Sequence, residues 1–315
     1  MSRIVYLLLT NAGVAGGQKV ILRHVETLIE LGFDAAVLTA DDMKPPQWLR
    51  HETPYIAAPD LRASDIFVVP DDGVPALGFA LERGLRTVVL CQSSAPYLAA
   101  GGLKTLVEHE ARFSTLLSVA PGHTAMLRRL FPKAVIETVR CFADERLFRP
   151  GEKTFTGAMV PRKRPAEAAA IRLLSRRLHP ATAELGWVRL ENASEAQVAK
   201  TFAAASVHLS LSRMESVGLT TLEALASGCV CAGFTGGGGR QYATPDNGFW
   251  VDDDDCLAAA DALAQAVSLV RGGGPPLRRY VEAALTTAQQ WSYAAFRAEL
   301  ADVWARLAPE ARTRA

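Results

Sequence analysis

Short hydrophobic runs alternate with amphipathic segments through the first half of the chain. The run at 4–9 precedes a glycine-containing loop and a segment whose apolar residues return at the spacing of one helix face. That face consists of Ile21, Val25, Leu28 and Ile29. Gly32 follows where such a helix would end, and a second hydrophobic run occupies 35–39. The opening segment therefore predicts a β-α-β unit.

The same alternation continues along the rest of the chain. Further hydrophobic runs lie at 66–69, 87–90, 115–120 and 229–234, and 137–141 is interpreted as the last strand of the first half. A basic stretch at 161–165 interrupts the pattern, and helical segments at 166–178 and 195–204 then flank a short strand at 186–190. This order is typical of a parallel sheet with helices on both faces. The predicted fold class is α/β, and 315 residues are enough for two domains of ordinary size.

The stretch 205–228 joins a strand to a helix and is the most informative part of the chain. One strand face carries Val207, Leu209 and Leu211, and helical spacing begins at Leu219. The loop 216–219 therefore stands at a helix N-terminus, where free N–H groups and the positive dipole end favour a phosphate. Gly218 has no Cβ and lets the backbone approach a ligand closely.

Two carboxylates flank this loop. Glu215 precedes the helix and would lie beside whatever group is attached to the phosphate. Glu223 lies more than a turn further on and could accept hydrogen bonds from two neighbouring hydroxyls, as a ribose presents. The alternative is that Glu215 is an N-terminal helix charge and Glu223 a solvated residue, since acidic residues near helix starts are favourable in any case.

The whole segment resembles the donor-site signature of the retaining glycosyltransferases of the GT-B fold, family four in particular (glycosyl transferases group 1). That signature is usually Glu-Gly-Phe-Gly, four residues, and Glu-Ala-Met-Ala-x-Gly. Here it reads Glu215-Ser-Val-Gly218, Leu-Thr-Thr-Leu, and Glu223-Ala-Leu-Ala-Ser-Gly228. Ser216 and Val217 replace the usual Gly and Phe. The resemblance extends over most of the chain.

The resemblance implies a domain organisation. Residues 1–150 would form an N-terminal, acceptor-side Rossmann-like domain, and residues 151–290 a C-terminal domain that binds the nucleotide sugar. The two would face each other across a cleft. Residues 291–315 would form a C-terminal helix that crosses back to the N-terminal domain.

The resemblance also assigns roles to residues. Glu215 would be the catalytic residue. The donor would be bound by Gly16, Gly17, Arg162, Lys163, Ser216, Val217, Gly218, Leu219 and Glu223. Gly16 and Gly17 match the Gly-Gly pair before the first long helix of the family, although a purely structural turn is an alternative. The spacing Gly-x-x-Gly-Gly at 13–17 does not match the dinucleotide fingerprint Gly-x-Gly-x-x-Gly.

Arg162 and Lys163 would neutralise the leaving diphosphate, with Arg164 in reserve. Fixed cations stabilise the charge that builds on a leaving phosphate. Adjacent side chains diverge on a strand, so the pair requires a loop conformation. The alternative is a solvated basic linker.

The chain departs from the family at one important place. Many relatives carry a histidine after the fourth strand of the first domain, where this chain has Cys91-Gln92-Ser93-Ser94. His24 and His123 fall in helical segments and are interpreted as packing or surface residues. His208 alternates with core positions of a strand and is expected to face away from them.

Composition excludes several other functions. The net charge of +1 gives no field that would attract a nucleic acid. The five cysteines show no paired metal spacing, and their odd number fits a reducing cytoplasm. The carboxylates at 252–255 cannot converge on a metal from one turn, and they are expected to start the next helix. We therefore expect neither a metal nor a cofactor other than the nucleotide-sugar substrate.

These observations predict a cytoplasmic, metal-independent, retaining glycosyltransferase. It would move a sugar from a nucleoside diphosphate to a hydroxyl-bearing acceptor, such as a glycan or a lipid-linked sugar, and a peripheral membrane contact is compatible with that role. Two alternatives remain open: a nucleotide-sugar epimerase, and a catalytically silent subunit that binds a sugar nucleotide. The residues leave the base, the sugar, the acceptor and the oligomeric state open.

Overall fold

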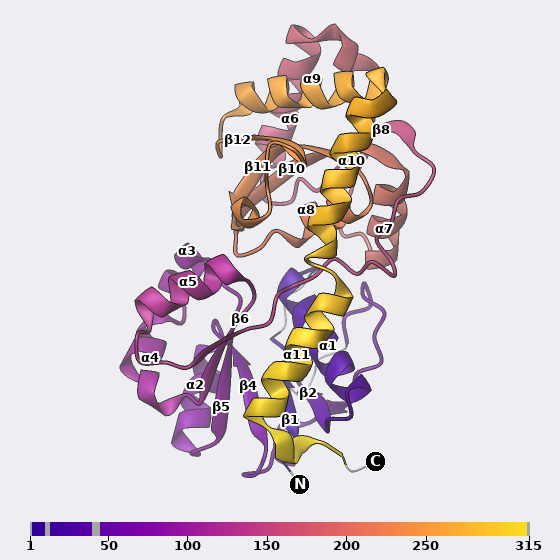
Figure 1. The fold of residues 1–315 in the computed structure, drawn as a ribbon. Coiled ribbons are helices and arrows are strands. Elements are labelled where there is room, and N and C mark those ends of the chain that lie inside the picture. The colour runs from indigo at the N-terminus through magenta and orange to yellow at the C-terminus, as the bar shows by residue number, and fades with distance from the viewer. Residues whose placement is uncertain (1, 10–12, 40–44, 314–315) are drawn as a thin grey trace. The chain divides into compact units, whose positions relative to one another are not determined.

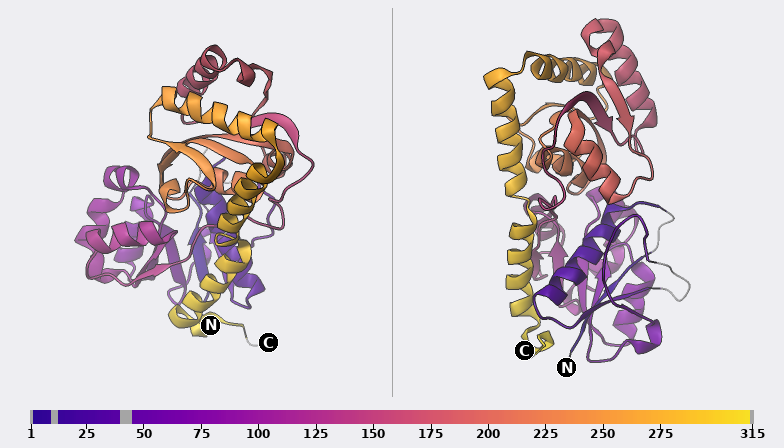
Figure 2. Two further views of the ribbon diagram at one scale, coloured as in Figure 1. Left: turned by 45° about the horizontal axis from the view of Figure 1, so that its top comes forward. Right: turned by 90° about the vertical axis from the view of Figure 1, so that its right-hand side faces the viewer.

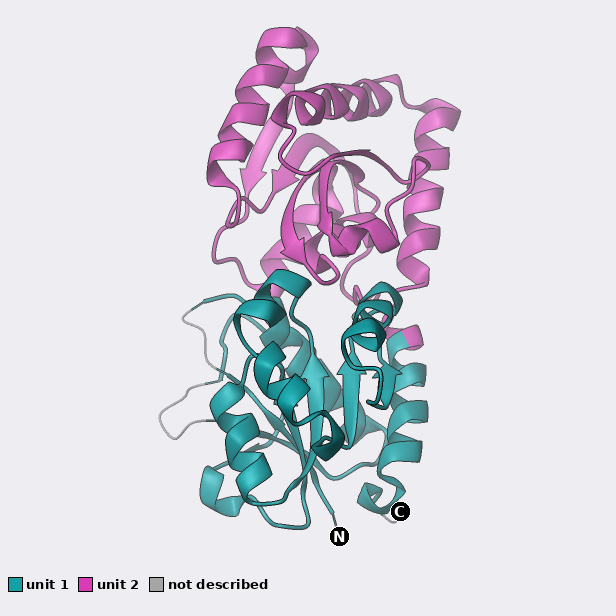
Figure 3. Cartoon of the chain, turned by 90° about the vertical axis from the view of Figure 1, so that its left-hand side faces the viewer, with its two compact units in different colours: residues 1–141, 296–315 teal, residues 142–295 magenta. Residues whose placement is uncertain are grey.

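The computed structural model describes residues 2–9, 13–39 and 45–313, which form two compact units. Unit 1 contains Met1–Cys141 and Phe296–Ala315, and unit 2 contains Phe142–Ala295 (Figure 3). The boundaries by which the sequence separates the domains, at 150 and 290, lie close to these divisions of the chain.

Unit 1 is built on a parallel sheet with the strand order β3-β2-β1-β4-β5-β6-β7 (Figure 1). Its strands are β1 Ile4–Leu7, β2 Ala35–Leu38, β3 Tyr55–Ile56, β4 Ile66–Pro70, β5 Arg86–Cys91, β6 Thr115–Ser118 and β7 Ile136–Thr138. Its helices include α1 Gly16–Glu30, α2 Val74–Glu82, α3 Ala95–Ala100, α4 Leu103–Glu108 and α5 Pro121–Leu130. The order reverses between β1 and β4, and such a switch point is where open α/β sheets bind ligands. The opening β-α-β unit is confirmed.

The C-terminal helix α11 (Tyr293–Leu307) belongs to unit 1 from Phe296 onward. It lies alongside α1 (Figure 2), and the ring of Phe296 is 5.1 Å from that of His24. Trp304 is fully buried beside Tyr6. His24 is therefore a packing residue, as the sequence predicts.

Unit 2 has a second parallel sheet with the order β12-β11-β10-β8-β9. Its strands are β8 Thr154–Met159, β9 Gly186–Arg189, β10 Ala205–Glu215, β11 Val230–Gly237 and β12 Gly248–Val251. Its helices include α6 Pro165–Leu178, α7 Glu195–Ala204, α8 Leu219–Ala226, α9 Cys256–Gly272 and α10 Gly274–Gln289. The central strand β10 packs Val207, Leu209 and Leu211 into one hydrophobic core with residues of α6 and α9, which confirms the predicted face.

A partly buried lysine, Lys153, ties the ends of two helices in unit 2. The Nζ of Lys153 donates hydrogen bonds to the carbonyl oxygens of Phe202 and Ala205, each at 2.9 Å, and of Ser227 at 2.6 Å. These carbonyls lie at the C-terminal ends of α7 and α8, where the helix dipole favours a cation. Burial lowers the pKa of the Lys153 ammonium group.

None of the helices in the described part of the chain has the length and hydrophobicity that crossing a membrane requires.

We expect Lys153→Met to lower the free energy of unfolding by about 3 kcal/mol, because three buried carbonyls lose a charged donor. Lys200→Met, at an exposed position of α7, is the matched control and should change it by less than about 0.5 kcal/mol. Urea denaturation of both variants measures the difference. Equal midpoints would show that the Lys153 bonds contribute no net stability.

Candidate functional site

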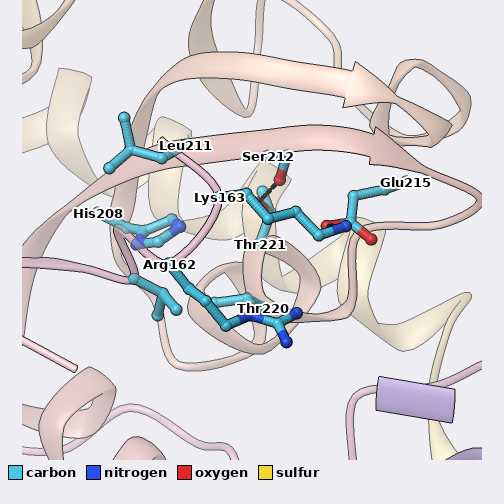
Figure 4. Close-up of a pocket in the computed structure, with 9 residues that line it drawn as sticks. Arg162, Lys163, His208, Leu211, Ser212, Glu215, Thr220 and Thr221 are labelled. Atoms are coloured by element: carbon cyan, nitrogen blue, oxygen red, sulfur yellow. Dashed lines mark hydrogen bonds and ion pairs between the residues drawn. The ribbon is translucent and has the colours of Figure 1, made fainter. Parts of the chain in front are cut away.

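Part of the predicted site in unit 2 lies in one pocket: Arg162, Lys163 and Glu215 line it, whereas Ser216, Val217, Gly218, Leu219 and Glu223 are not among its lining residues. The loop after β8, the end of β10 and the first turn of α8 all contribute to it (Figure 4). Its lining residues are Val160, Arg162, Lys163, His208, Leu211, Ser212, Glu215, Thr220 and Thr221. Arg162, Lys163 and Glu215, which the sequence selects from two separate segments, therefore line the same cavity.

A bulge at the end of β10 aims Glu215 into the pocket. The register between β10 and β11 shifts between Ser212 and Glu215, and Met214 has a positive φ of 50°. Such a φ is uncommon for a residue with a long side chain, and bulges of this kind redirect side chains next to functional sites. Glu215 accepts a hydrogen bond of 2.8 Å from the Nζ of Lys163 (Figure 4).

The start of α8 depends on a glycine. Gly218 has a φ of +87°, and its carbonyl accepts a 2.8 Å hydrogen bond from the hydroxyl of Tyr242. A Cβ at this position would lie 2.9 Å from that hydroxyl oxygen, so only glycine fits. The helix behind it rests on β10 through the 2.9 Å hydrogen bond between the Ser210 and Thr221 hydroxyls.

The loop residues 216–219 differ in what they expose. The side chain of Val217 is buried, so this residue presents its backbone to a ligand, while Ser216 and Leu219 are partly exposed. The first amides of α8 have no acceptor within the helix. Thr220 and Thr221 of this first turn line the pocket together with Arg162 and Lys163, at the place where the sequence predicts an anion site.

Glu223 lies one turn further along α8. Residues three apart on a helix share a face, so Glu223 is on the side of Thr220, which lines the pocket. Only 7% of Glu223 is exposed. The alternative that it is a solvated surface residue is therefore wrong.

The basic stretch at 161–165 divides its cations between the pocket and the interior. Arg162 and Lys163 occupy a turn, closed by a 2.9 Å hydrogen bond from the Arg164 amide to the Pro161 carbonyl, so the required loop conformation is present. Arg164 is buried, donates to the carbonyl of Ser212 at 3.1 Å and lies over the ring of Phe234. It holds the pocket wall and is not available as a reserve phosphate ligand.

Three of the carboxylates at 252–255 have partners within unit 2. Asp255 caps α9 by accepting a 2.9 Å hydrogen bond from the Ala258 amide, which confirms the predicted helix start. Asp253 accepts from the Gly236 amide at 3.1 Å. Asp254 pairs with Arg164, which lowers the pKa of this carboxyl. In the ranges that the structure describes, no group of three or more histidine, cysteine or acidic residues is placed to hold a metal ion.

His208 is a pocket residue that sequence reasoning missed. It does face away from Val207 and Leu209, as predicted, yet it is buried and lines the pocket. Burial lowers the pKa of its imidazole to about 4. The signal in the sequence was a row of alternating polar residues, at 208, 210 and 212, on the strand that leads into the signature.

In unit 1, Gly16 and Gly17 are the first residues of α1. A Cβ on Gly17 would lie 2.9 Å from the amide nitrogen of the Gln92 side chain, so the glycine allows a close approach between α1 and the segment after β5. That segment is the one in which the family's histidine is absent.

Two buried side chains hold this segment in place. Asp71 accepts hydrogen bonds from the Ser93 amide at 3.1 Å and the Ser93 hydroxyl at 3.0 Å. His123 donates from Nε2 to the Ser93 carbonyl at 2.9 Å. Burial raises the pKa of Asp71 to about 6. His123 is therefore a packing residue, and its hydrogen bond to Ser93 anchors the backbone beside Gln92.

Comparison with known proteins finds a family model that matches part of the chain and a curated relative that is similar over most of it. Residues 150–268, which include the pocket, match the family model described as glycosyl transferases group 1. An alpha-1,6-glucosyltransferase of Actinobacillus pleuropneumoniae is 25% identical over 280 residues, which cover 84% of this chain and 83% of the relative.

Some of the similar solved structures match the chain almost from end to end. Sucrose-phosphate synthase of Thermosynechococcus elongatus superposes with a TM-score of 0.72 at 16% identity, covering 98% of this chain and 100% of the other. HepE of Anabaena in complex with UDP-glucose superposes with a TM-score of 0.71 at 13% identity, covering 97% and 100%. These likenesses confirm the fold class, which is two Rossmann-like domains of the GT-B fold.

Gly238, which follows β11, packs directly against the backbone of the loop before α8 and leaves no room for a side chain. An added Cβ would lie 2.3 Å from the carbonyl carbon of Ser216 and 2.5 Å from the Val217 amide nitrogen. We expect Gly238→Ala to lower the free energy of unfolding by at least about 2 kcal/mol, because backbone must move. Gly272→Ala, whose Cβ meets nothing within 4 Å, is the control and should be neutral or slightly stabilising. Thermal unfolding compares the two; equal melting temperatures would mean that the loop adapts freely.

Proposed function

We infer that this chain, a GT-B-fold glycosyltransferase of the group 1 type, transfers a sugar from a nucleoside diphosphate to an acceptor hydroxyl with retention of configuration. The observation that carries the proposal is the pocket that joins two cations, a helix N-terminus and Glu215 within the segment matched by the family model. This combination binds a diphosphate and leaves a carboxylate beside the group attached to it.

The diphosphate would lie against Arg162, Lys163 and the first amides of α8. When the bond between the anomeric carbon and the phosphate oxygen breaks, negative charge grows on that oxygen. Cations fixed in a partly buried site stabilise this charge without having to reorganise. We propose that these side chains serve in place of a metal ion.

Glu215 would lie near the anomeric carbon, where positive character develops as the leaving group departs. Its ion pair with Lys163 fixes the carboxylate and the ammonium group relative to each other. The acceptor oxygen forms its bond to the anomeric carbon on the face that the phosphate leaves. The acceptor proton passes to the departing phosphate oxygen, so this step needs no separate base.

The comparisons suggest a particular donor. The curated relative is named as a glucosyltransferase, and the Anabaena structure contains UDP-glucose. We therefore propose UDP-glucose as the first donor to test, with a sugar hydroxyl as acceptor. Release of UDP from UDP-glucose, with and without candidate acceptors, separates an active transferase from a subunit that only binds.

We predict that the isolated chain binds UDP equally well in EDTA and in magnesium. The Arg162→Ala/Lys163→Ala variant should bind at least about tenfold more weakly, since each charge-assisted contact contributes about 1.5–3 kcal/mol. Arg176→Ala/Arg177→Ala, an adjacent exposed pair on α6, is the matched control and should bind normally. Calorimetric titration measures the affinity of the wild-type protein and of both double variants for UDP. Binding that EDTA abolishes and magnesium restores would contradict the metal-free proposal.

Substitutions of Glu223 and Glu215 should affect different quantities, donor affinity for the first and turnover for the second. Glu223→Gln should weaken donor binding and leave turnover less affected, because a ribose contact is made equally in the ground and transition states. Glu215→Gln should lower turnover more than affinity, because its charge acts mainly in the transition state. Glu184→Gln, an exposed carboxylate whose ion pair with Arg271 lies outside the pocket, serves as the control.

Donor titrations combined with steady-state rates separate the two effects. If both pocket variants bind and turn over normally, the signature has no role in transfer. A loss of binding alone in both would favour the silent subunit.

A further inference from the structure

His208 presents an unused hydrogen-bond acceptor to the pocket. Its Nδ1 lies 3.2 Å from the carbonyl oxygen of Ala158 on β8, and its ring meets that of Phe202 edge-on at 5.1 Å. A carbonyl can only accept, so Nδ1 carries the hydrogen and Nε2 carries the lone pair. Among the described residues Nε2 has no hydrogen-bond partner, and it is not sealed from solvent.

The surroundings keep the ring neutral. Burial is the main cause of its lowered pKa, so at neutral pH the imidazole carries no charge. The charged or titratable groups on its own strand and on the elements around it are Arg162, Lys163, Glu195, Lys200, Arg213, Glu215, Glu223 and Cys231.

A neutral ring with its lone pair on Nε2 can accept a hydrogen bond, so it favours a ligand group that donates one. The Nε2 lone pair would repel a phosphate oxygen, which Arg162 and Lys163 are better suited to hold. A hydroxyl group can donate to it. Resting on the function proposed above, we propose that His208 is a donor-binding residue whose Nε2 accepts a hydrogen bond from a hydroxyl of the bound nucleotide sugar.

Two variants separate this contact from simple packing. In His208→Asn the amide nitrogen can replace Nδ1 and keep the bond to Ala158, while nothing takes the place of Nε2. In His208→Gln the longer side chain places its amide near the position of Nε2. We expect the Asn variant to bind UDP-glucose about threefold to tenfold more weakly, the factor for one neutral hydrogen bond, and the Gln variant to recover most of that loss.

Titrating UDP beside UDP-glucose identifies the hydroxyl. An equal loss for both ligands in His208→Asn places the contact on the ribose, and a loss for UDP-glucose alone places it on the hexose. Either result supports the proposal. If wild-type protein prefers another base, the corresponding pair of ligands replaces these two.

The pH dependence of binding to the wild-type protein gives a test that needs no variant. The diphosphate of UDP-glucose does not titrate between pH 5.5 and 8, so a hydroxyl contact predicts a nearly constant Kd across this range. A Kd that tightens as the pH falls would mean that His208 binds the phosphate as a cation, and would overturn the proposal. So would a His208→Asn variant that binds both ligands like wild type. If wild-type protein binds no nucleoside diphosphate at all, the proposed function itself fails.

Discussion

The donor pocket depends on how abruptly β10 becomes α8. Only two residues separate the end of the strand at Glu215 from the glycine that caps the helix, and the backbone makes the turn by placing Met214 and Gly218 in left-handed conformations. The hydroxyl of Tyr242 holds the turn by donating a hydrogen bond to the Gly218 carbonyl. This geometry turns the Glu215 carboxylate and the positive end of the helix toward one cavity. A looser connection would keep the same residues and lose their convergence, because neither the bulge nor the cap would fix a direction.

Cationic side chains in unit 2 do different work according to their partners and their burial. Lys153 is partly buried, and its ammonium group is taken up by three backbone carbonyls at the ends of α7 and α8. Arg164 is buried and joins the strand end to the acidic turn after β12. Lys163 is only partly buried, and its ion pair with Glu215 leaves it within reach of a ligand. A half-buried cation keeps part of its hydration and can exchange it for a phosphate, whereas a fully buried cation must satisfy its hydrogen bonds within the protein.

The sequence alone predicts most of the framework and part of the site. Strands such as β1 and β5 are buried on both faces, so continuous hydrophobic runs mark them, whereas β10 is marked by the alternation of Val207, Leu209 and Leu211 with polar residues. The strand β8 cannot be recognised by a continuous hydrophobic run, because its first half contains two threonines and is partly exposed. The pocket role of His208 is also hidden, since it depends on the carbonyl of Ala158, fifty residues away in the chain. Local periodicity cannot report such a partner. The same reason explains why Arg164, next to two pocket cations in sequence, belongs to the interior.

The missing histidine of unit 1 changes what the segment after β5 can do. Gln92 stands against Gly17, and the backbone next to it is fixed from both sides by Asp71 and His123. Both nitrogens of His123 have partners among the described residues, Ser93 and Ser118, and burial lowers the pKa of its ring. It is therefore poorly placed to take a proton from an acceptor. An amide such as Gln92 can orient a hydroxyl through hydrogen bonds, but it cannot deprotonate one. In the reaction proposed above, the acceptor proton would pass to the leaving phosphate oxygen, so the amide of Gln92 would only have to orient the acceptor hydroxyl.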